Sequence, residues 1–444
     1  MENADILIVN GRIITLDKTD QIIENGFVAV HGHTIFALGP MNHLSPPYHA
    51  RRILDAKGGM VLPGLINAPT HAATTCFRGI ADDMELLDWL NHYIFPAEAK
   101  NLSPELVYWG TLLACAEMIK SGTTTFCDMY IFEEEVAQAA REAGIRCLLG
   151  EGLFDFSSPN NKTPQDALSY TKRFIEKWRD DPLVNIAIEP HSLYSCSESL
   201  LLAARDIARN YQLPLALHLL ESREEVRILT KKLQMKATDY LKKNDILDSN
   251  FIAFHCVCMD DDDIAVFADY GCKVVHNPES NMKLASGIAP VTAMINKGIT
   301  VALGTDGCAS NNNLDLFQEM DTAAKLGKLS QLNPTDMSAK TVLSMATRYG
   351  AKALGLDQIA GELKPGMEAD LIIIDMNKPH LTPLYNPYSH LVYTVGGADV
   401  DTVLIRGRIV MENRRLLTID EGRIMAEVIR IAEKVRDSLV STTL

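Results

Sequence analysis

Hydrophobic and polar residues alternate over short stretches at both ends of the chain. Near the amino end, ADILIVNGRIITLD and NGFVAVHGHTIFALG are runs rich in β-branched residues that Asn-Gly or Gly interrupts, a pattern typical of hairpins. Residues 366–375 (GMEADLIIID) and 401–413 (DTVLIRGRIVMEN) repeat it. The pattern predicts one small β-sandwich domain built from residues 1–60 and 361–420. A helix is predicted over 421–444, where apolar residues recur at helical spacing.

The middle of the chain, residues 61–360, alternates short apolar runs with helical stretches such as PELVYWGTLLACAEMIKSG and TVLSMATRYGAKALG. Such alternation predicts strands joined by helices, and therefore a parallel sheet. Eight strand-like runs over ~300 residues predict an α/β fold, a closed (β/α)8 TIM barrel. The predicted strands are MVLPGLIN, TTTFCDM, IRCLLGEGL, VNIAIEPHS, LPLALHLLE, FIAFHCV, CKVVHNP and ITVALGTDG.

Composition narrows the classes of function. With 47% hydrophobic residues the chain can form a large core, and 57 acidic against 42 basic residues give a net charge of −15. An acidic surface disfavours nucleic acid or an anionic membrane as the main partner, and no apolar run reaches the ~18 residues of a membrane helix. The nine cysteines contain no Cys-x-x-Cys pair, and the amino end lacks a cationic leader. We therefore expect a cytoplasmic protein with reduced thiols.

Polar side chains follow the predicted strands at their carboxyl ends. The strand LPLAL runs into His218, FIAF into His255, CKVV into His276, VNIAIEP into His191 and ITVALGT into Asp306. Because the carboxyl ends of all barrel strands meet at one mouth, we expect these side chains to converge there. Imidazoles with a carboxylate suit Zn²⁺ or a similar divalent ion.

Glu221 lies three residues beyond His218, on the loop that leaves the strand. A carboxyl group beside an activated water can carry protons between that water and a leaving group. The same residue is also suited to begin the helix that follows, because a carboxylate favours the positive end of a helix. The residues alone leave both interpretations open.

Long strings along nearly the whole chain carry a family resemblance. They are NGRIITLD, VLPGLINAPTHA, PHSLYSCS, HLLES, HNPESNMKLASGIAPV, LGTDGCASNNNLDLF and GELKPGMEADLIIID. In these strings the sequence resembles the amidohydrolase superfamily, and more closely its branch of 5′-methylthioadenosine/S-adenosylhomocysteine deaminases and related chlorohydrolases. The resemblance implies a barrel flanked by a β-sandwich from both termini, with a mononuclear metal centre.

The resemblance also implies the ligands of that metal: a His-x-His after the first barrel strand, a histidine after the fifth and an aspartate after the eighth. These positions fall on His71, His218 and Asp306, and the ion they imply is zinc, or alternatively iron or manganese. Pro69 stands where the family has the leading histidine. Proline has no donor atom in its side chain, but three protein ligands and a water form an accepted catalytic zinc site. A catalytically impaired barrel that only binds a ligand is one alternative.

The activity that the resemblance implies is hydrolytic deamination of an adenine nucleoside to the inosine analogue and ammonia. Glu221 matches the glutamate that takes a proton from the water and delivers it to the purine ring. His255 and Asp306 match the residues that orient the water for attack on C6. The metal lowers the pKa of that water toward neutrality.

The substrate-binding positions that the resemblance implies are Trp89, Glu98, His191, Glu221 and Asp306. Trp89 matches a residue that packs on the nucleoside, Glu98 one that holds the ribose hydroxyls, and His191 one that binds the purine. An alternative substrate is another aminated or chlorinated heterocycle such as guanine, cytosine or an s-triazine, but none of these offers a ribose diol. The expected partner is thus a small nucleoside, and we expect a homo-oligomer because most soluble oligomers are of that kind.

The 5′-substituent of the nucleoside is a separate question. Glu151 stands where the nearest family members carry an arginine that pairs with the carboxylate of S-adenosylhomocysteine. A carboxylate at this position would repel that group. We therefore expect 5′-methylthioadenosine, 5′-deoxyadenosine or adenosine to be preferred over S-adenosylhomocysteine.

Overall fold

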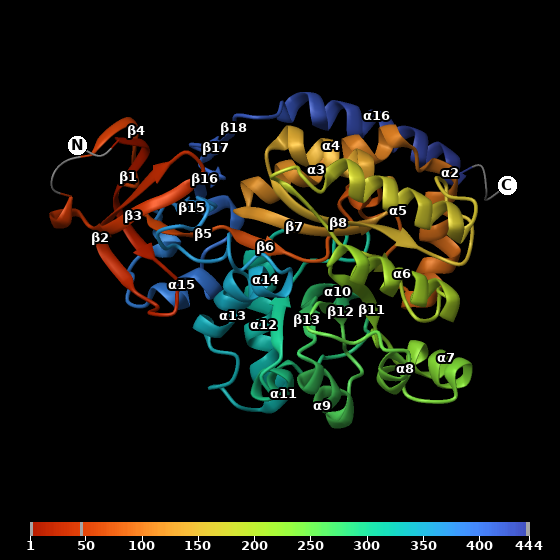
Figure 1. Cartoon of the computed structure of the whole chain (residues 1–444). Coiled ribbons are helices and arrows are strands. Elements are labelled where there is room, and N and C mark those ends of the chain that lie inside the picture. The colour runs from red at the N-terminus through yellow and green to blue at the C-terminus, as the bar shows by residue number, and fades with distance from the viewer. Residues whose placement is uncertain (1–2, 45–47, 441–444) are drawn as a thin grey trace.

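The computed structural model describes residues 3–44 and 48–440, and it combines a β-rich body with a barrel (Figure 1). The β-rich body is a nine-stranded sheet in the order β18-β17-β16-β15-β5-β1-β2-β3, with β4 paired to β1. The strands from the two ends of the chain join where β5 pairs with β15 in antiparallel orientation. The strands are β1 (Asn3–Ile14), β2 (Ile22–His31), β3 (Thr34–Pro40), β4 (His49–Asp55), β5 (Met60–Pro63), β15 (Leu371–Ile374), β16 (Val400–Ile405), β17 (Arg408–Glu412) and β18 (Arg415–Leu416).

The barrel consists of parallel strands that pair in chain order, which confirms the predicted (β/α)8 class. Its strands are β6 (Leu65–Asn67), β7 (Thr123–Tyr130), β8 (Arg146–Leu153), the pair β9 (Val184–Ile186) and β10 (Glu189–Pro190), β11 (Leu215–Leu219), β12 (Phe251–His255), β13 (Lys273–His276) and β14 (Thr300–Leu303). A bridge between Ser192 and His218 joins the fourth and fifth positions. The Ala68 N–H donates to the Leu303 carbonyl at 3.4 Å, which joins the first and eighth.

The run MVLPGLIN, predicted as one strand, serves two sheets. Its first half is β5 in the nine-stranded sheet, and its second half is β6 in the barrel. Between them lies Gly64, where a Cβ atom would stand 2.1 Å from the Thr124 hydroxyl oxygen. Only glycine lets the chain pass this close to β7, so the switch between sheets occurs there. Apolar periodicity does not reveal such a switch, because both halves are equally buried.

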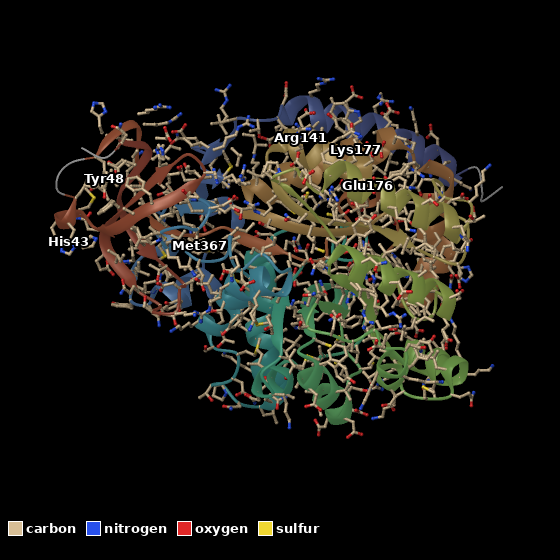
Figure 2. All side chains as sticks on the ribbon, in the orientation of Figure 1. His43, Tyr48, Arg141, Glu176, Lys177 and Met367 are labelled. Carbon is tan, nitrogen blue, oxygen red and sulfur yellow. The ribbon has the colours of Figure 1, made fainter. Side chains whose placement is uncertain are left out.

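The helices cover the outside of the barrel, and charged side chains such as Arg141 on α4 and Lys177 on α5 face outward from them (Figure 2). The predicted helix over 341–355 is divided into α13 and α14. The helices along the barrel and after it are α3 (Pro104–Lys120), α4 (Glu133–Ala143), α5 (Pro164–Trp178), α6 (Glu198–Tyr211), α7 (Arg223–Leu233), α8 (Ala237–Lys243), α9 (Asp261–Tyr270), α10 (Pro278–Lys283), α11 (Val291–Asn296), α12 (Leu316–Gln331), α13 (Ala339–Met345), α14 (Arg348–Ala353) and α15 (Pro387–Tyr393).

A long helical segment separates β6 from α3 and brings Trp89 and Glu98 to the cavity described below. It consists of a 3-10 helix, η2 (Ala72–Phe77), then α1 (Leu86–Trp89), a π-helical turn η3 (Leu90–Ile94) and α2 (Phe95–Asn101). The carboxyl-terminal helix α16 (Glu421–Val440) packs against α3 and α2, and Figure 1 shows it in blue along that side. The rest of the predicted span, 441–444, lies outside the described residues. None of the described helices is long and apolar enough to span a membrane.

Candidate active site

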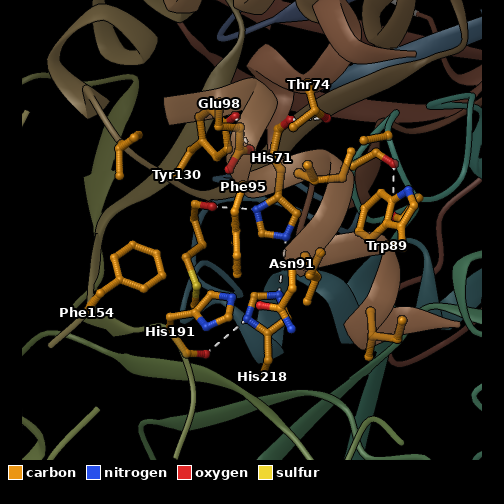
Figure 3. Close-up of a pocket in the computed structure, with 18 of the residues that line it drawn as sticks. His71, Thr74, Trp89, Asn91, Phe95, Glu98, Tyr130, Phe154, His191 and His218 are labelled. Atoms are coloured by element: carbon orange, nitrogen blue, oxygen red, sulfur yellow. Dashed lines mark hydrogen bonds between the residues drawn. The ribbon is translucent and has the colours of Figure 1, made fainter. Parts of the chain in front are cut away.

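Two histidines at the barrel mouth turn the same ring nitrogen toward each other (Figure 3). The His71 Nδ1–H donates to the Met129 carbonyl, and the His218 Nδ1–H donates to the His191 carbonyl at 3.1 Å. Each ring therefore directs Nε2, and not Nδ1, toward the other, and the two Nε2 atoms lie 3.2 Å apart. A tautomer fixed by a backbone carbonyl is typical of histidines that bind metal ions.

Asp306 completes a three-residue group with these histidines. Its Oδ1 lies 3.1 Å from His71 Nε2, while its Oδ2 accepts hydrogen bonds from the Ser280 and Ser310 hydroxyls at 2.7 and 2.8 Å. The candidate ligand atoms of His71, His218 and Asp306 all lie within 4.8 Å of one another. Two imidazole nitrogens and a carboxylate oxygen at this spacing fit one divalent ion.

Pro69 contributes to this group only through its backbone. It is buried, and its carbonyl accepts the N–H of Asp306 at 3.0 Å. Two residues earlier, the Asn67 side-chain oxygen accepts the N–H of Thr305 at 2.8 Å. The segment that carries Pro69 thus holds the Asp306 loop in place.

Burial and mutual charge set the protonation of these groups. Burial lowers the pKa of His218 well below its ordinary value and that of His191 to about 3. Burial acts in the same direction on His71, but the hydrogen bond and charge of Asp306 outweigh it and raise the pKa of His71 to about 9. Burial would raise the pKa of Asp306, yet the hydrogen bond and charge of His71 hold it well below its usual range. Asp306 is therefore ionised and His218 neutral, the forms in which both bind cations. His71 shares a proton with Asp306 through Nε2, and a cation bound at Nε2 would replace that proton.

Glu221 and His255 lie beside the three-residue group. Glu221 Oε2 is 4.0 Å from His255 Nε2, and the His255 Nδ1–H donates to the Asn281 side-chain oxygen at 2.9 Å. Burial raises the pKa of Glu221. A carboxyl group whose pKa is shifted toward neutrality is suited to both accept and donate a proton.

The structure assigns the start of the helix after Glu221 to the neighbours of that residue. Helix α7 begins at Arg223, and its N-cap is Ser222, whose hydroxyl accepts the N–H of Glu225. The Glu225 carboxylate in turn accepts the N–H groups of Leu220 and Glu221, at 3.1 and 2.6 Å. Glu221 itself lines the cavity. Its side chain is thus available to a ligand, while its neighbours cap the helix.

A cavity of about 420 Å³ opens in front of these residues. Trp89 and Glu98 line it, as does His191, whose ring lies 5.0 Å from that of Phe154. The Trp89 Nε1–H donates to the Ala81 carbonyl at 3.0 Å (Figure 3). Because this donor is already used, Trp89 offers a ligand in the cavity only the apolar surface of its ring. Around this cavity the structure brings together eight of the residues selected from the sequence: His71, Trp89, Glu98, His191, His218, Glu221, His255 and Asp306.

His276 does not belong to this group, although we expected it to converge with the other strand ends. It is buried, but it does not line the cavity. Side chains alternate along a strand, and the preceding Val275 packs into the interior of the barrel. His276 still pairs with Leu303 as part of the regular strand, so it faces away from the interior, on the same side as Val274. His255 stands at the matching position of β12, but its φ of 68° departs from the strand conformation, and it lines the cavity.

Glu151 is also placed differently from our expectation. It is buried outside the cavity, where it accepts hydrogen bonds from the side-chain amides of Asn160 and Asn161 and from the Glu133 N–H. Burial raises its pKa to about 8. Glu151 therefore fixes the loop that precedes α5, and the premise that it faces the substrate is wrong.

Several residues that complete the site were not identified from the sequence. Tyr130 lines the cavity, Ser280 holds Asp306, and Asn281 holds His255. Tyr130 ends the strand TTTFCDMY, so the same strand-end rule that selected the histidines includes it. Ser280 and Asn281 lie in HNPESNMK, directly after β13.

Comparisons with known proteins show the family of the chain. A model of the Amidohydrolase family matches residues 60–410. The chain is 63% identical over 439 residues to the 5-methylthioadenosine/S-adenosylhomocysteine deaminase 1 of Syntrophus aciditrophicus, covering 99% of both chains. It is 44% identical over 434 residues to the 5′-deoxyadenosine deaminase of Methanosarcina mazei, covering 97% of this chain and 98% of that one.

Among solved structures, an adenosine deaminase from Xanthomonas campestris with bound zinc superimposes with a TM-score of 0.96. It is 33% identical, and the match covers 98% of this chain and 99% of that one. The family model, the long relatives and the structural match coincide along nearly the whole sequence. The chain belongs to the amidohydrolase family.

Proposed function

We propose that the protein is a metal-dependent hydrolase that deaminates adenine nucleosides. The observation that carries the proposal is the placement of a proton-carrying glutamate, Glu221, beside the two histidines and the aspartate at one end of a nucleoside-sized cavity. Relatives that match nearly the full length are named as deaminases of 5-methylthioadenosine, S-adenosylhomocysteine and 5′-deoxyadenosine. The product is the inosine analogue, with ammonia released.

The ion that we infer is zinc, held by Nε2 of His71, Nε2 of His218 and the Asp306 carboxylate. The fixed tautomers of the histidines and the ionised aspartate support it, as does the zinc in the Xanthomonas campestris adenosine deaminase. When bound, the ion supplies a Lewis acid that activates a water at neutral pH. Pro69 has no donor atom in its side chain, so His71, His218 and Asp306 would be the side chains that hold the ion.

Proton transfer then falls to Glu221. Its carboxylate takes one proton from the attacking water and delivers it to the purine ring nitrogen beside C6, which makes C6 more electrophilic. The water oxygen bonds to C6, the bond from C6 to the exocyclic nitrogen breaks, and the second water proton leaves with the amine as ammonia. His255, held by Asn281 through Nδ1, and Asp306 orient the water toward C6.

The nucleoside itself is held by the remaining cavity residues. The Trp89 ring packs on the nucleoside. His191 contacts the purine through Nε2, because its Nδ1 lies 3.0 Å from the Ser195 hydroxyl. Glu98 accepts hydrogen bonds from the ribose hydroxyls. The two ribose hydroxyls can both donate to one carboxylate. A free base has no such hydroxyls, so this contact distinguishes a nucleoside from a free base.

The cavity favours a neutral 5′-substituent. Among the described residues that line it, none is a lysine or an arginine, and its walls include Phe95, Phe154 and Phe156. A carboxylate bound there would lose its hydration without gaining a cation. We therefore propose 5′-deoxyadenosine, 5′-methylthioadenosine or adenosine as better substrates than S-adenosylhomocysteine.

The unpaired state of the cysteines supports a proposal for the cell compartment. All nine cysteines are free, and all but Cys258 are buried. Structures with many unpaired thiols are typical of reducing compartments. We place the protein in the cytoplasm on this ground.

A substrate screen tests the proposal. The metal-loaded protein is assayed for ammonia release with adenosine, 5′-deoxyadenosine, 5′-methylthioadenosine and S-adenosylhomocysteine, and with adenine, guanine, cytosine and an s-triazine. We expect turnover of the nucleosides, with S-adenosylhomocysteine slowest among them. Turnover of free adenine as fast as adenosine, or of guanine, cytosine or triazine alone, would contradict the proposal.

A further inference from the structure

Tyr130 and Glu98 form a hydrogen-bonded pair on the wall of the cavity. The Tyr130 hydroxyl donates to Glu98 Oε1 at 2.5 Å. Tyr130 is the last residue of β7, whereas Glu98 lies in α2, and both line the cavity (Figure 3). The bond therefore joins the helical segment that carries Glu98 to the rigid barrel.

Two successive residues at the end of β7 hold side chains in two parts of the site, one at the metal ligands and one at the carboxylate assigned to the ribose. The Met129 carbonyl accepts the Nδ1–H of His71, and the Tyr130 hydroxyl donates to Glu98. One rigid strand end thus sets the position of a metal ligand and of the carboxylate assigned to the ribose. Groups fixed to the same element keep a constant separation, which a site needs if it is to hold C6 of the purine and the ribose at once.

The pair also determines which carboxylate oxygen is free. With Oε1 bound to Tyr130, Oε2 has no hydrogen-bond partner among the described residues. It therefore remains available to a ligand in the cavity that both residues line. A glutamate side chain has several rotatable bonds, and a single strong hydrogen bond to a buried phenol restricts them. The carboxylate is consequently presented in one orientation before any nucleoside enters.

We propose that Tyr130 is the positioning residue that orients Glu98 and thereby sets the preference for nucleosides with an intact ribose diol. The inference rests on the proposed function, because it takes the role of Glu98 from there. Tyr130 acts through Glu98 and takes no part in the proton transfer at C6. Its loss should raise KM and reduce discrimination by the sugar, while kcat changes little.

The variant Tyr130→Phe removes the hydroxyl and keeps the ring. A hydrogen bond to a carboxylate corresponds to a change of about tenfold in binding. We expect KM for adenosine to rise about tenfold with kcat within about threefold, and the ratio of kcat/KM for adenosine over 2′-deoxyadenosine to fall by about the same tenfold factor.

A matched control is available elsewhere in the chain. The Tyr108 hydroxyl on α3 donates to Glu142 Oε2 on α4, also at 2.5 Å, on the outside of the barrel. Tyr108→Phe therefore removes the same kind of bond without touching the cavity. It should leave both KM and the sugar preference unchanged, which separates the specific effect from loss of any Tyr–Glu bond.

A double variant shows whether Tyr130 works through Glu98. In a Glu98→Ala protein, the further change Tyr130→Phe should alter neither KM nor the sugar preference by more than about twofold, because the acceptor is already absent. An unchanged sugar preference in Tyr130→Phe alone, or a further tenfold loss in the Glu98→Ala background, would overturn the inference. If the wild-type protein deaminates no nucleoside, the proposed function fails instead, so the two failures are distinct.

Discussion

Replacing Glu221 by glutamine tests the chemical step most sharply. Glutamine keeps the size and shape of the side chain but cannot carry a proton between the water and the purine ring. Glu221 is buried, its Oε2 lies 4.0 Å from His255 Nε2, and its backbone N–H is held by Glu225. The substitution therefore alters one functional group in a position that the backbone fixes independently.

The size of the effect follows from the role. Positioned general acid–base groups contribute ~10²–10⁴-fold to rates, which corresponds to about 2.7–5.4 kcal/mol in activation free energy. No second carboxyl group in the described cavity lining stands as near to His255, so we expect the full loss in kcat. Nucleoside binding should change little, because the aromatic walls and Glu98 are untouched.

The assay compares initial rates of ammonia release from 5′-deoxyadenosine, together with the dissociation constant measured by calorimetry and the metal content of each protein. The control is Glu224→Gln, which alters an exposed carboxylate on α7 that pairs with Arg227. We expect the control to match wild type. A Glu221→Gln protein that holds metal, binds substrate and retains most of its activity would refute the assigned role.

Two further predictions concern the metal and ribose ends of the site. Pro69→His should change kcat/KM by less than about threefold, because three ligands already suffice; a gain of 100-fold or more in ammonia release on this substitution would instead indicate an impaired native site. Burial raises the pKa of Glu98 to about 7, although the Tyr130 hydrogen bond and the His71 charge oppose it. The carboxylate is thus protonated below about pH 7 and loses an acceptor for the ribose, so KM for adenosine should rise as pH falls through 7 and stay level above it. Steady-state KM values across this range check the trend, and a Glu98→Gln protein should show no such dependence.

The sequence predicted most of the barrel because apolar runs and parallel connections follow general rules. The strand-end rule also selected His191, His218, His255 and Asp306, which the structure brings to one cavity. It failed for His276, which continues the regular strand and so alternates out of the barrel, whereas His255 at the matching position of β12 has a positive φ of 68° and lines the cavity. Residue patterns cannot show which of two consecutive positions faces inward when both are buried.

Other features depend on contacts between distant segments. His71 was identified from the resemblance alone, because its strand is too short for any periodicity. Glu151 was misplaced because nothing in its own strand shows that Asn160 and Asn161 fold back over it. The pair of Tyr130 and Glu98 joins a strand end to a helix 32 residues earlier, and only the folded chain shows it.

The proposed activity depends on an ion held jointly by two imidazoles and a carboxylate. The most direct measurement is anomalous X-ray scattering from crystals of the zinc-loaded protein. We expect a single strong peak about 2.0–2.2 Å from Nε2 of His71, Nε2 of His218 and a carboxylate oxygen of Asp306. A catalytically active crystal form with no peak at that point, or with zinc bound to other residues, would contradict it.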